Sequence, residues 1–364
     1  MIKSGVHFLR ACVLTTLIVQ LPAFARQIEK PLTSQELVRL VYQLSARSAK
    51  KEDVISEIRR RGIGFPLTGG IRSLVASKSG SDADLRRTLE EAERRRVNPA
   101  ESTLPPEAEG EEVLRRARES ALAAADEMPD FVVKQIIKRS FARGSTKNWR
   151  SSDQLTVAVS YRGGTGEQYK LLAVNGLPAA AQSSENNSYE QVGGTSSTGE
   201  YVSMMKSLFD ASSQSKFKMT DTDLLRERRT IVYEFEVKKE NSQQMIKAGS
   251  AASAQSVVTG YRGRLWLDRE NYRVLRIENI STDIPADFPV TAASSRIDYD
   301  WVMIAEQKYL LPVRAEIVLT SGLGEREYQS RNEIRFRNYQ KYGSEVKILE
   351  DDGADLPEEI PNNP

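Results

Sequence analysis

The stretch YRGRLWLDRENYRVLRIENI, residues 261–280, decides the fold class of this chain. A polar break at residues 268–271 separates two apolar runs. In each run neighbouring apolar side chains fall on opposite faces: Leu265 and Leu267 oppose Trp266, and Leu275 and Ile277 oppose Val274. A period of two is typical of a pleated strand with two different faces. The stretch therefore predicts a β-hairpin.

The same alternation recurs through most of the chain after residue 131. Its runs are rich in valine, isoleucine, phenylalanine and tyrosine, which suit a pleated surface. They lie at residues 131–141, 154–161, 169–173, 231–237, 297–304, 309–320 and 328–339. Helical spacing appears in two short stretches, residues 111–127 just before this part and residues 201–209 within it. We expect a strongly curved antiparallel sheet or half-open β-barrel with one or two packed helices.

Residues 26–97 are expected to form a small helical bundle instead. Thr33 and Glu36 have the spacing of a capping box, Gly62 ends a second helix, and Ser81 or Asp82 caps a fourth. The proline-containing residues 98–111 are expected to be a linker, and residues 350–364 a disordered tail. With the sheet placed at residues 112–349, the predicted fold class is α+β.

The first 25 residues have the features of a secretory signal peptide. Lys3 and Arg10 precede an apolar run at residues 11–21, and Ala23 and Ala25 flank Phe24 in a small-residue cleavage pattern. We expect a mature chain that is periplasmic or secreted. No later apolar stretch has the length of a membrane-spanning helix, so no transmembrane segment is expected in the mature chain.

Removal of this leader would take away the only cysteine, Cys12, and the only histidine, His7. A mature chain without these residues would lack thiolate and imidazole metal ligands, histidine-activated nucleophiles and disulfides, so we expect no metal and no cofactor. The leader carries two of the 52 basic residues and no acidic one, which leaves 50 basic against 50 acidic residues. Because this balance gives no net field for a polyanion, no nucleic acid partner is expected. The arginines at residues 94–96 are interpreted as a solvated helix end.

The sequence also argues against catalysis. Asp268, Glu270, Asp298 and Asp300 are the carboxylates that could form a glycosidase pair. The DRE segment fits an exposed turn, and the two carboxylates of DYD lack a second supporting element. The glycines at residues 163–166 lead into a strand and lack the lysine of a phosphate-binding loop. We therefore expect a non-catalytic protein.

Two longer motifs resemble a known family. The segments GYRGRLWLDRENYRVLRIE and DYDWVMIAEQKYLLPVRAEIVL resemble the periplasmic carriers that sort outer-membrane lipoproteins, over residues 111–349. The resemblance implies an acyl ligand, or a lipoprotein, bound inside a half-open barrel that helices close. The segments IRRRGIGFPLT and LRRTLEEAERR resemble a helical module of secreted bacterial proteins without an assigned role, which implies docking or spacing.

Two functions therefore remain open. In the first, the concave face of the sheet binds an apolar or acyl ligand. In the second, the interior is filled and the chain docks on an envelope protein through residues 26–97. The aromatic candidates for ligand contact, which in the alternative are ordinary core residues, are Tyr233, Phe235, Trp266, Trp301 and Phe336. A ligand-sized cavity, about 300 to 1,000 Å³, would favour the first function.

Overall fold

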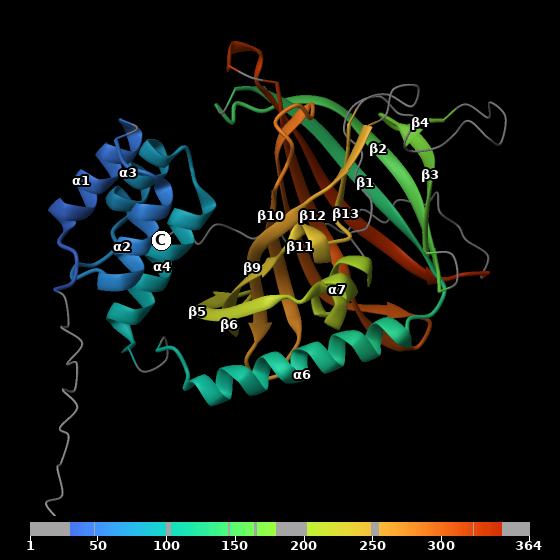
Figure 1. The fold of residues 1–364 in the computed structure, drawn as a ribbon, viewed down its shortest axis with the longest axis horizontal. Coiled ribbons are helices and arrows are strands. Elements are labelled where there is room, and N and C mark those ends of the chain that lie inside the picture. Colours follow the sequence, from blue (N-terminus) through green and yellow to red (C-terminus); the bar gives the residue numbers. More distant parts are fainter. Residues whose placement is uncertain are drawn as a thin grey trace, which may run out of the picture.

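The computed structural model describes residues 30–46, 48–99, 103–144, 146–163, 166–179, 202–248, 255–322 and 324–343. Helices at the N-terminal end are followed by a large curved antiparallel sheet, which confirms the predicted α+β class (Figure 1). The expected signal peptide and the expected tail lie outside the described residues.

Four helices make up the helical module: α1 (Ser34–Ser45), α2 (Lys51–Arg61), α3 (Gly69–Ser79) and α4 (Ala83–Val97). The capping box of Thr33 and Glu36 is present, and Gly62 ends α2 with a φ of 68°. Asp82 caps α4 by accepting hydrogen bonds from the amides of Asp84 and Leu85. The apolar faces of the four helices close around one another in a core of their own.

Helix α6 (Glu107–Asp126) begins four residues before its predicted start, inside the expected linker. Pro106 precedes the helix, and Glu107 and Glu109 lie in its first turn, where the helix dipole stabilises negative charge. A shorter helix, α7 (Val202–Phe209), is present where the sequence predicts one. Figure 1 shows α6 running across the open side of the sheet with α7 beside it.

The strands of the main sheet are β1 (Phe131–Arg143), β2 (Arg150–Arg162), β3 (Gly166–Val174), β4 (Leu177–Pro178), β5 (Lys216–Leu225), β6 (Arg228–Val237), β9 (Gly260–Asp268), β10 (Val274–Thr282), β11 (Val290–Ile304), β12 (Gln307–Ser321) and β13 (Tyr328–Lys341). Their order is β4-β3-β2-β1-β13-β12-β11-β10-β9-β6-β5, and all pairs are antiparallel. Two meanders are thus joined by the pairing of β1 with β13. The sheet is open, with β4 and β5 as its edges.

The alternation predicts the first arm of the central hairpin correctly and the second arm incorrectly. On β9, Leu265 and Leu267 face the main core, and Trp266 faces the other side. On β10 the register shifts between Val274 and Arg276, so that Val274 and Ile277 enter the main core while Leu275 joins Trp266. The cause is a β-bulge, because one extra residue reverses the face of the residues that follow.

Other departures from the expected meander have local causes. Strand β5 gives no clear signal, because lysines and aspartates interrupt its apolar pattern. A small second sheet, β7 (Met245–Ala248) with β8 (Gln255–Val258), follows strand β6 in what reads as a polar loop. By contrast, Pro312 lies beside a register shift, as a proline inside a sheet should.

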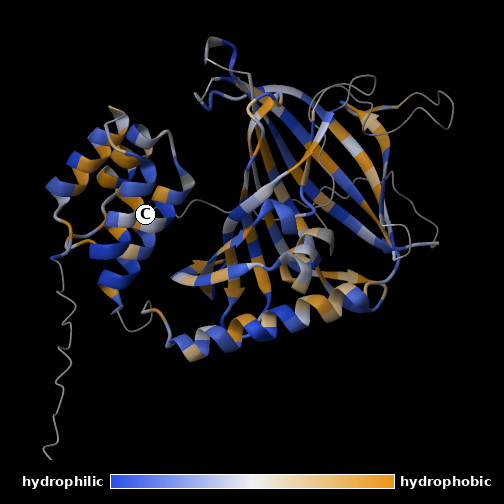
Figure 2. Cartoon of the chain, viewed as in Figure 1, coloured by the Kyte–Doolittle hydropathy of each residue, from blue (hydrophilic) through white to orange (hydrophobic). Residues whose placement is uncertain are grey.

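The main core lies between the concave face of the sheet and helices α6 and α7. Figure 2 shows the strands alternating between apolar and polar residues along their length. Gly263 marks the closest approach of β9 to β10, because a β-carbon added there would lie 1.8 Å from the carbonyl oxygen of Glu278. That position therefore admits only glycine without movement of the backbone.

We predict that Gly263→Ala lowers the free energy of unfolding by about 1–3 kcal/mol or more, because β9 and β10 must separate. Gly69→Ala is the matched control, since a β-carbon there meets nothing within 4 Å. It should leave stability unchanged or raise it by at most about 1 kcal/mol. Urea unfolding followed by circular dichroism measures both, and equal effects would contradict the proposed close approach.

Candidate functional site

Helix α6 contacts the sheet tightly at its N-terminal end. Gly110 faces β5 and β6, and a β-carbon added there would lie 2.7 Å from the sulfur of Met219. The hydroxyl of Tyr233 donates a hydrogen bond of 2.8 Å to the carbonyl oxygen of Gly110. Burial, with a further contribution from Glu109, raises the pKa of the Tyr233 phenol far above its usual range. The hydroxyl therefore remains a donor that anchors this end of the helix.

Towards its C-terminal end, α6 is separated from the sheet by a groove. Alanines at five positions of α6 and Met205 of α7 line one side of a groove of about 580 Å³. The other side consists of the β9–β10 turn and the β11–β12 hairpin, including Tyr272, Val274, Trp301, Tyr309, Leu310 and Leu311. Small side chains on the helix leave a gap that longer ones would fill. The groove continues the main core, because Ala121, Val274 and Leu311 belong to both.

Charged groups stand at the rim of this groove. The guanidinium of Arg273 lies 5.5 Å from the ring centre of Trp301, and that of Arg116 lies 4.7 Å from the ring centre of Tyr272. Lys308 and Glu127 also line the groove. The arrangement is an apolar wall with polar groups at the opening, which suits a ligand that is mostly apolar and has one polar end.

The concave face is not apolar at every level. Two residues along the strands from the main core, the same level of the sheet carries Arg139, Asp153, Asn332 and Asn279. Arg139 donates a hydrogen bond of 2.6 Å to Asp153, and Asn332 and Asn279 are buried. This polar level bounds the apolar region, so the space suited to an apolar ligand is the groove beside α6.

The five aromatic candidates for ligand contact lie in three different places in the structure. Tyr233, Phe235 and Phe336 are buried in the main core, which agrees with the alternative reading of them as core residues. Trp301 lines the groove and keeps 49% of its surface exposed. Trp266 lies on the opposite face of the sheet and is fully buried there. Only Trp301 is therefore placed to contact a ligand in the groove.

Trp266 is covered from both sides of the contact, by Arg87 of the helical module and by Arg276 and Asp223 of the sheet. The guanidinium of Arg87 lies 4.6 Å from the ring centre of Trp266, and the ring nitrogen donates to Asp223 at 3.0 Å. The interpretation of residues 94–96 as a solvated helix end is wrong for the first two arginines: Arg94 pairs with Asp223 at 2.7 Å, and Arg95 pairs with Asp221. Both arginines form these ion pairs because α4 lies against β5.

The four carboxylates that sequence analysis weighed for catalysis have different surroundings. Asp268 is buried, contrary to an exposed turn, and accepts hydrogen bonds from Arg228 and from the amides of Glu270 and Asn271. Glu270 is exposed. Asp298 accepts a hydrogen bond of 2.6 Å from Arg276, and Asp300 lies 3.6 Å from Arg226. These pairings account for the carboxylates as parts of the sheet.

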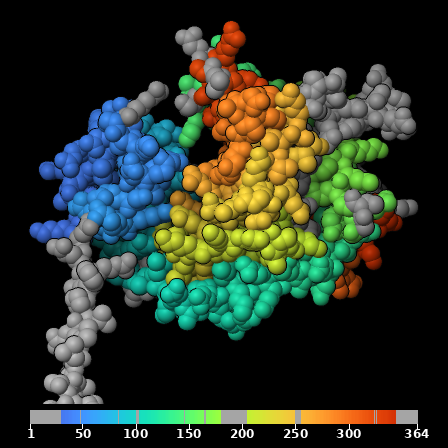
Figure 3. Space-filling view, viewed as in Figure 1, coloured from blue at the N-terminus to red at the C-terminus, as the bar shows by residue number. Residues whose placement is uncertain are grey.

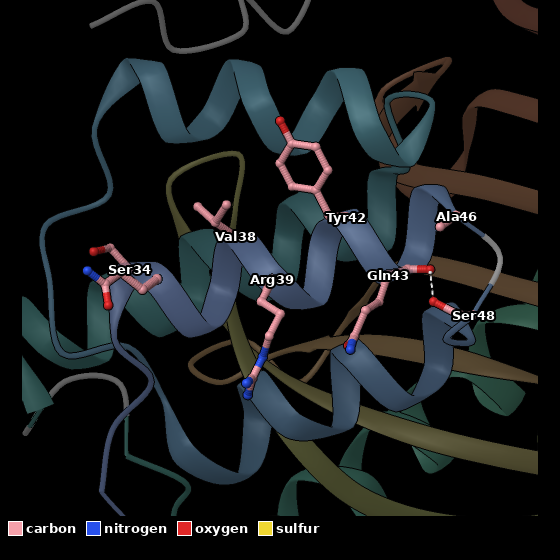
Figure 4. A pocket seen from close by; sticks show the side chains of 8 residues that line it. Ser34, Val38, Arg39, Tyr42, Gln43, Ala46 and Ser48 are labelled. Carbon is pink, nitrogen blue, oxygen red and sulfur yellow. Dashed lines mark hydrogen bonds between the residues drawn. The ribbon is translucent and has the colours of Figure 1, made fainter.

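A second concavity, of about 640 Å³, follows the outer face of α1 (Figure 4). Val38 and Tyr42 point to one side of the helix, and Arg39 and Gln43 point to the other. All lining residues belong to α1 or to the turn after it, where Ser48 donates to the carbonyl oxygen of Gln43. A surface with a single wall holds a ligand from one side only, so we place the candidate site in the groove beside α6.

Sequence reasoning missed most of the groove. The alanines of α6 are apparent in the sequence, but only the fold shows that they line a groove between the helix and two hairpins of the sheet. Tyr272 and Arg273 directly follow the polar break of the central hairpin, where the sequence gives no sign of a ligand site. Met205 of α7 is buried in the main core and also lines the groove.

No protein-family model and no curated protein matches this chain. Among solved structures, a DUF1329 family protein from Desulfovibrio piger superposes with a TM-score of 0.29 and 11% identity, covering 63% of this chain and 93% of that one. The Pseudomonas aeruginosa MucA/MucB complex gives a TM-score of 0.17 and 10% identity, covering 61% and 93%. MucB in complex with MucA(peri) gives 0.17 and 9%, covering 62% and 94%.

Superpositions with such scores carry no argument about family or function. The resemblance to lipoprotein carriers therefore stays a prediction from the sequence motifs. Within the described residues, no helix combines the length and apolar character needed to cross a membrane.

We predict that Tyr233→Phe lowers the free energy of unfolding by about 1–3 kcal/mol, because the buried carbonyl of Gly110 loses its donor. Tyr309→Phe is the control, since that hydroxyl bonds only to Gln307 at an exposed position. Chemical denaturation of both variants measures the difference. Equal stabilities would show that the Tyr233 hydroxyl does not anchor α6.

The buried Asp268 predicts a pH-dependent contribution to stability. Burial acts to raise its pKa, but the hydrogen bonds from Arg228 and from two backbone amides outweigh this and hold the pKa below its usual value. The contribution is then complete above the ordinary aspartate pKa of about 3.9 and is lost as the pH falls below it.

Asp268→Asn should therefore be less stable than the parent chain by about 1–3 kcal/mol at neutral pH. The difference should shrink as the pH falls below about 4. Unfolding curves recorded for both proteins between neutral and acid pH test this, and a difference that does not change with pH would contradict it.

Proposed function

We propose that this chain is a non-catalytic exported protein that binds an acyl chain in the groove between α6 and the β9–β10 and β11–β12 hairpins. The groove carries the proposal: its volume of about 580 Å³ is within the range of small-molecule sites, and its walls are mostly apolar. The expected signal peptide supports export to the periplasm or beyond, and the motifs that resemble lipoprotein carriers support an acyl ligand.

The geometry also suggests how an acyl chain would lie. Alanine side chains and Met205 form one wall, and Leu310, Leu311 and Val274 form the other. An extended chain lying along α6 would cover these residues and leave its polar end near Arg273 and Lys308. Burial of apolar area, at about 25 cal/mol per Å², would supply most of the binding free energy.

Filling the groove is the direct test. We predict that the delipidated mature protein takes up a fluorescent fatty acid saturably, and that Ala124→Trp abolishes uptake by occupying the groove. Glu111→Trp is the matched control, because it adds the same side chain at an exposed position of α6 outside the groove. Fluorescence titration measures binding in all three proteins.

A second readout locates the ligand. A fatty acid brominated on its acyl chain should quench Trp301, which lines the groove, and leave the buried Trp266 unaffected. Single-tryptophan variants separate the two signals. Absence of saturable uptake, or equal uptake by both tryptophan variants of α6, would refute acyl binding in this groove.

A further inference from the structure

The contact between the helical module and the sheet is built from charges. Figure 3 shows the module against the side of the sheet that carries β5, β6, β9 and β10. Among the described residues, the ion pairs between the two parts include Arg59 with Asp221 and Glu234, Arg87 with Glu278, Arg94 with Asp223, Arg95 with Asp221, and Asp84 with Arg264. Thr222 adds a hydrogen bond of 2.5 Å to Glu91.

On the sheet, four carboxylates pair with arginines of the helical module, and one of them also accepts a hydrogen bond from Trp266. We call Asp221, Asp223, Glu234 and Glu278, together with Trp266, the acidic strip. Arg87 donates hydrogen bonds of 3.1 and 3.0 Å to the two oxygens of Glu278 while its guanidinium lies over Trp266. A carboxylate that accepts two hydrogen bonds from one guanidinium, beside an aromatic ring, favours arginine over lysine.

The two cores do not meet across this contact. The core of the helical module contains only residues of that module, and the cluster around Trp266 contains only Leu225, Val232 and Leu275 of the sheet. In the part of the chain that the structure describes, no buried apolar cluster spans the contact, which leaves ion pairs and the face of Trp266 as its main interactions. Ion pairs that lose their water gain little net free energy, although they demand a matching partner. Contacts of this kind between domains are commonly reversible.

Some groups at the contact oppose docking. Burial and the nearby charge of Arg59 lower the pKa of Arg264, because that guanidinium lies among other cations. Burial also raises the pKa of Glu91, although Thr222 and Arg94 act against the shift. Each of these charges would be better solvated if the helical module moved away from the sheet. Their desolvation therefore destabilises the docked state.

We propose that the helical module is an electrostatic latch, which covers the acidic strip and releases it to a partner segment that presents arginines on one helix face. Arg87 and Arg94 are seven residues apart, two turns of helix, so they lie on the same face of α4. A partner helix with this spacing would replace α4 on the strip. The latch lies on the convex side of the sheet and does not depend on a ligand in the groove.

Trp266 reports the state of the latch, because it is fully buried under Arg87 when the module is docked. In the full mature chain with Trp149→Phe and Trp301→Phe, acrylamide should quench Trp266 weakly at low salt. Quenching should rise several-fold as salt approaches about 1 M, where the screening length falls to about 3 Å. Unchanged far-ultraviolet circular dichroism would show that the protein stays folded.

Charge reversal gives a matched comparison within one run of arginines. Arg94→Glu with Arg95→Glu should move the rise in quenching to lower salt, because both residues pair with the acidic strip. Arg96→Glu should leave it unchanged, since Arg96 pairs with Glu93 on its own helix. A folded double variant in which Trp266 stays shielded at every salt concentration would overturn the latch.

The nature of the partner is tested with a synthetic peptide of the α4 sequence, residues 82–98. It should bind saturably to the chain carrying Arg94→Glu and Arg95→Glu, and less to the parent chain, whose strip is occupied. A control peptide with glutamine in place of the arginines at positions 87, 94 and 95 should not bind. Failure of the first peptide to bind the opened chain, or equal binding of both peptides, would refute an arginine-selective strip.

Discussion

The pairing of β1 with β13 is the constraint on which the rest of the structure depends. It joins the first strand after α6 to the last strand described, over residues 131–143 and 328–341. Without it the chain would form two separate meanders, each with an unpaired inner edge. With it the strands form one broad curved sheet, and α6, which leads directly into β1, is placed across the concave side.

The position of α6 then decides what the concave side can hold. Gly110 allows its N-terminal end to approach Met219 and Tyr233 closely, whereas the alanines near its C-terminal end leave a groove. Most of the interior is packed with side chains, including three of the aromatics that the sequence suggested for ligand contact. The molecule thus has a packed interior near one end of α6 and a mostly apolar groove near the other end.

On the convex side of the sheet, the contact with the helical module depends on charge instead of apolar packing. The module and the sheet each close an apolar core of their own, so their contact is left to arginines and carboxylates. Specificity in such a contact comes from the geometry of matched charges more than from buried area. Trp266 shows the consequence, because it faces away from the main core yet is shielded by Arg87 as completely as any core residue.

The amino-acid sequence by itself determined the local structure. Alternation identified most strands, capping residues such as Thr33 and Asp82 marked helix ends, and Gly62 ended α2, because these signals act between neighbours in the chain. Only the tertiary structure decided which faces meet. The joining of β1 to β13, the pairing of Arg94 with Asp223 and the separation of Trp266 from Trp301 all depend on residues far apart in sequence, whose proximity no local pattern records.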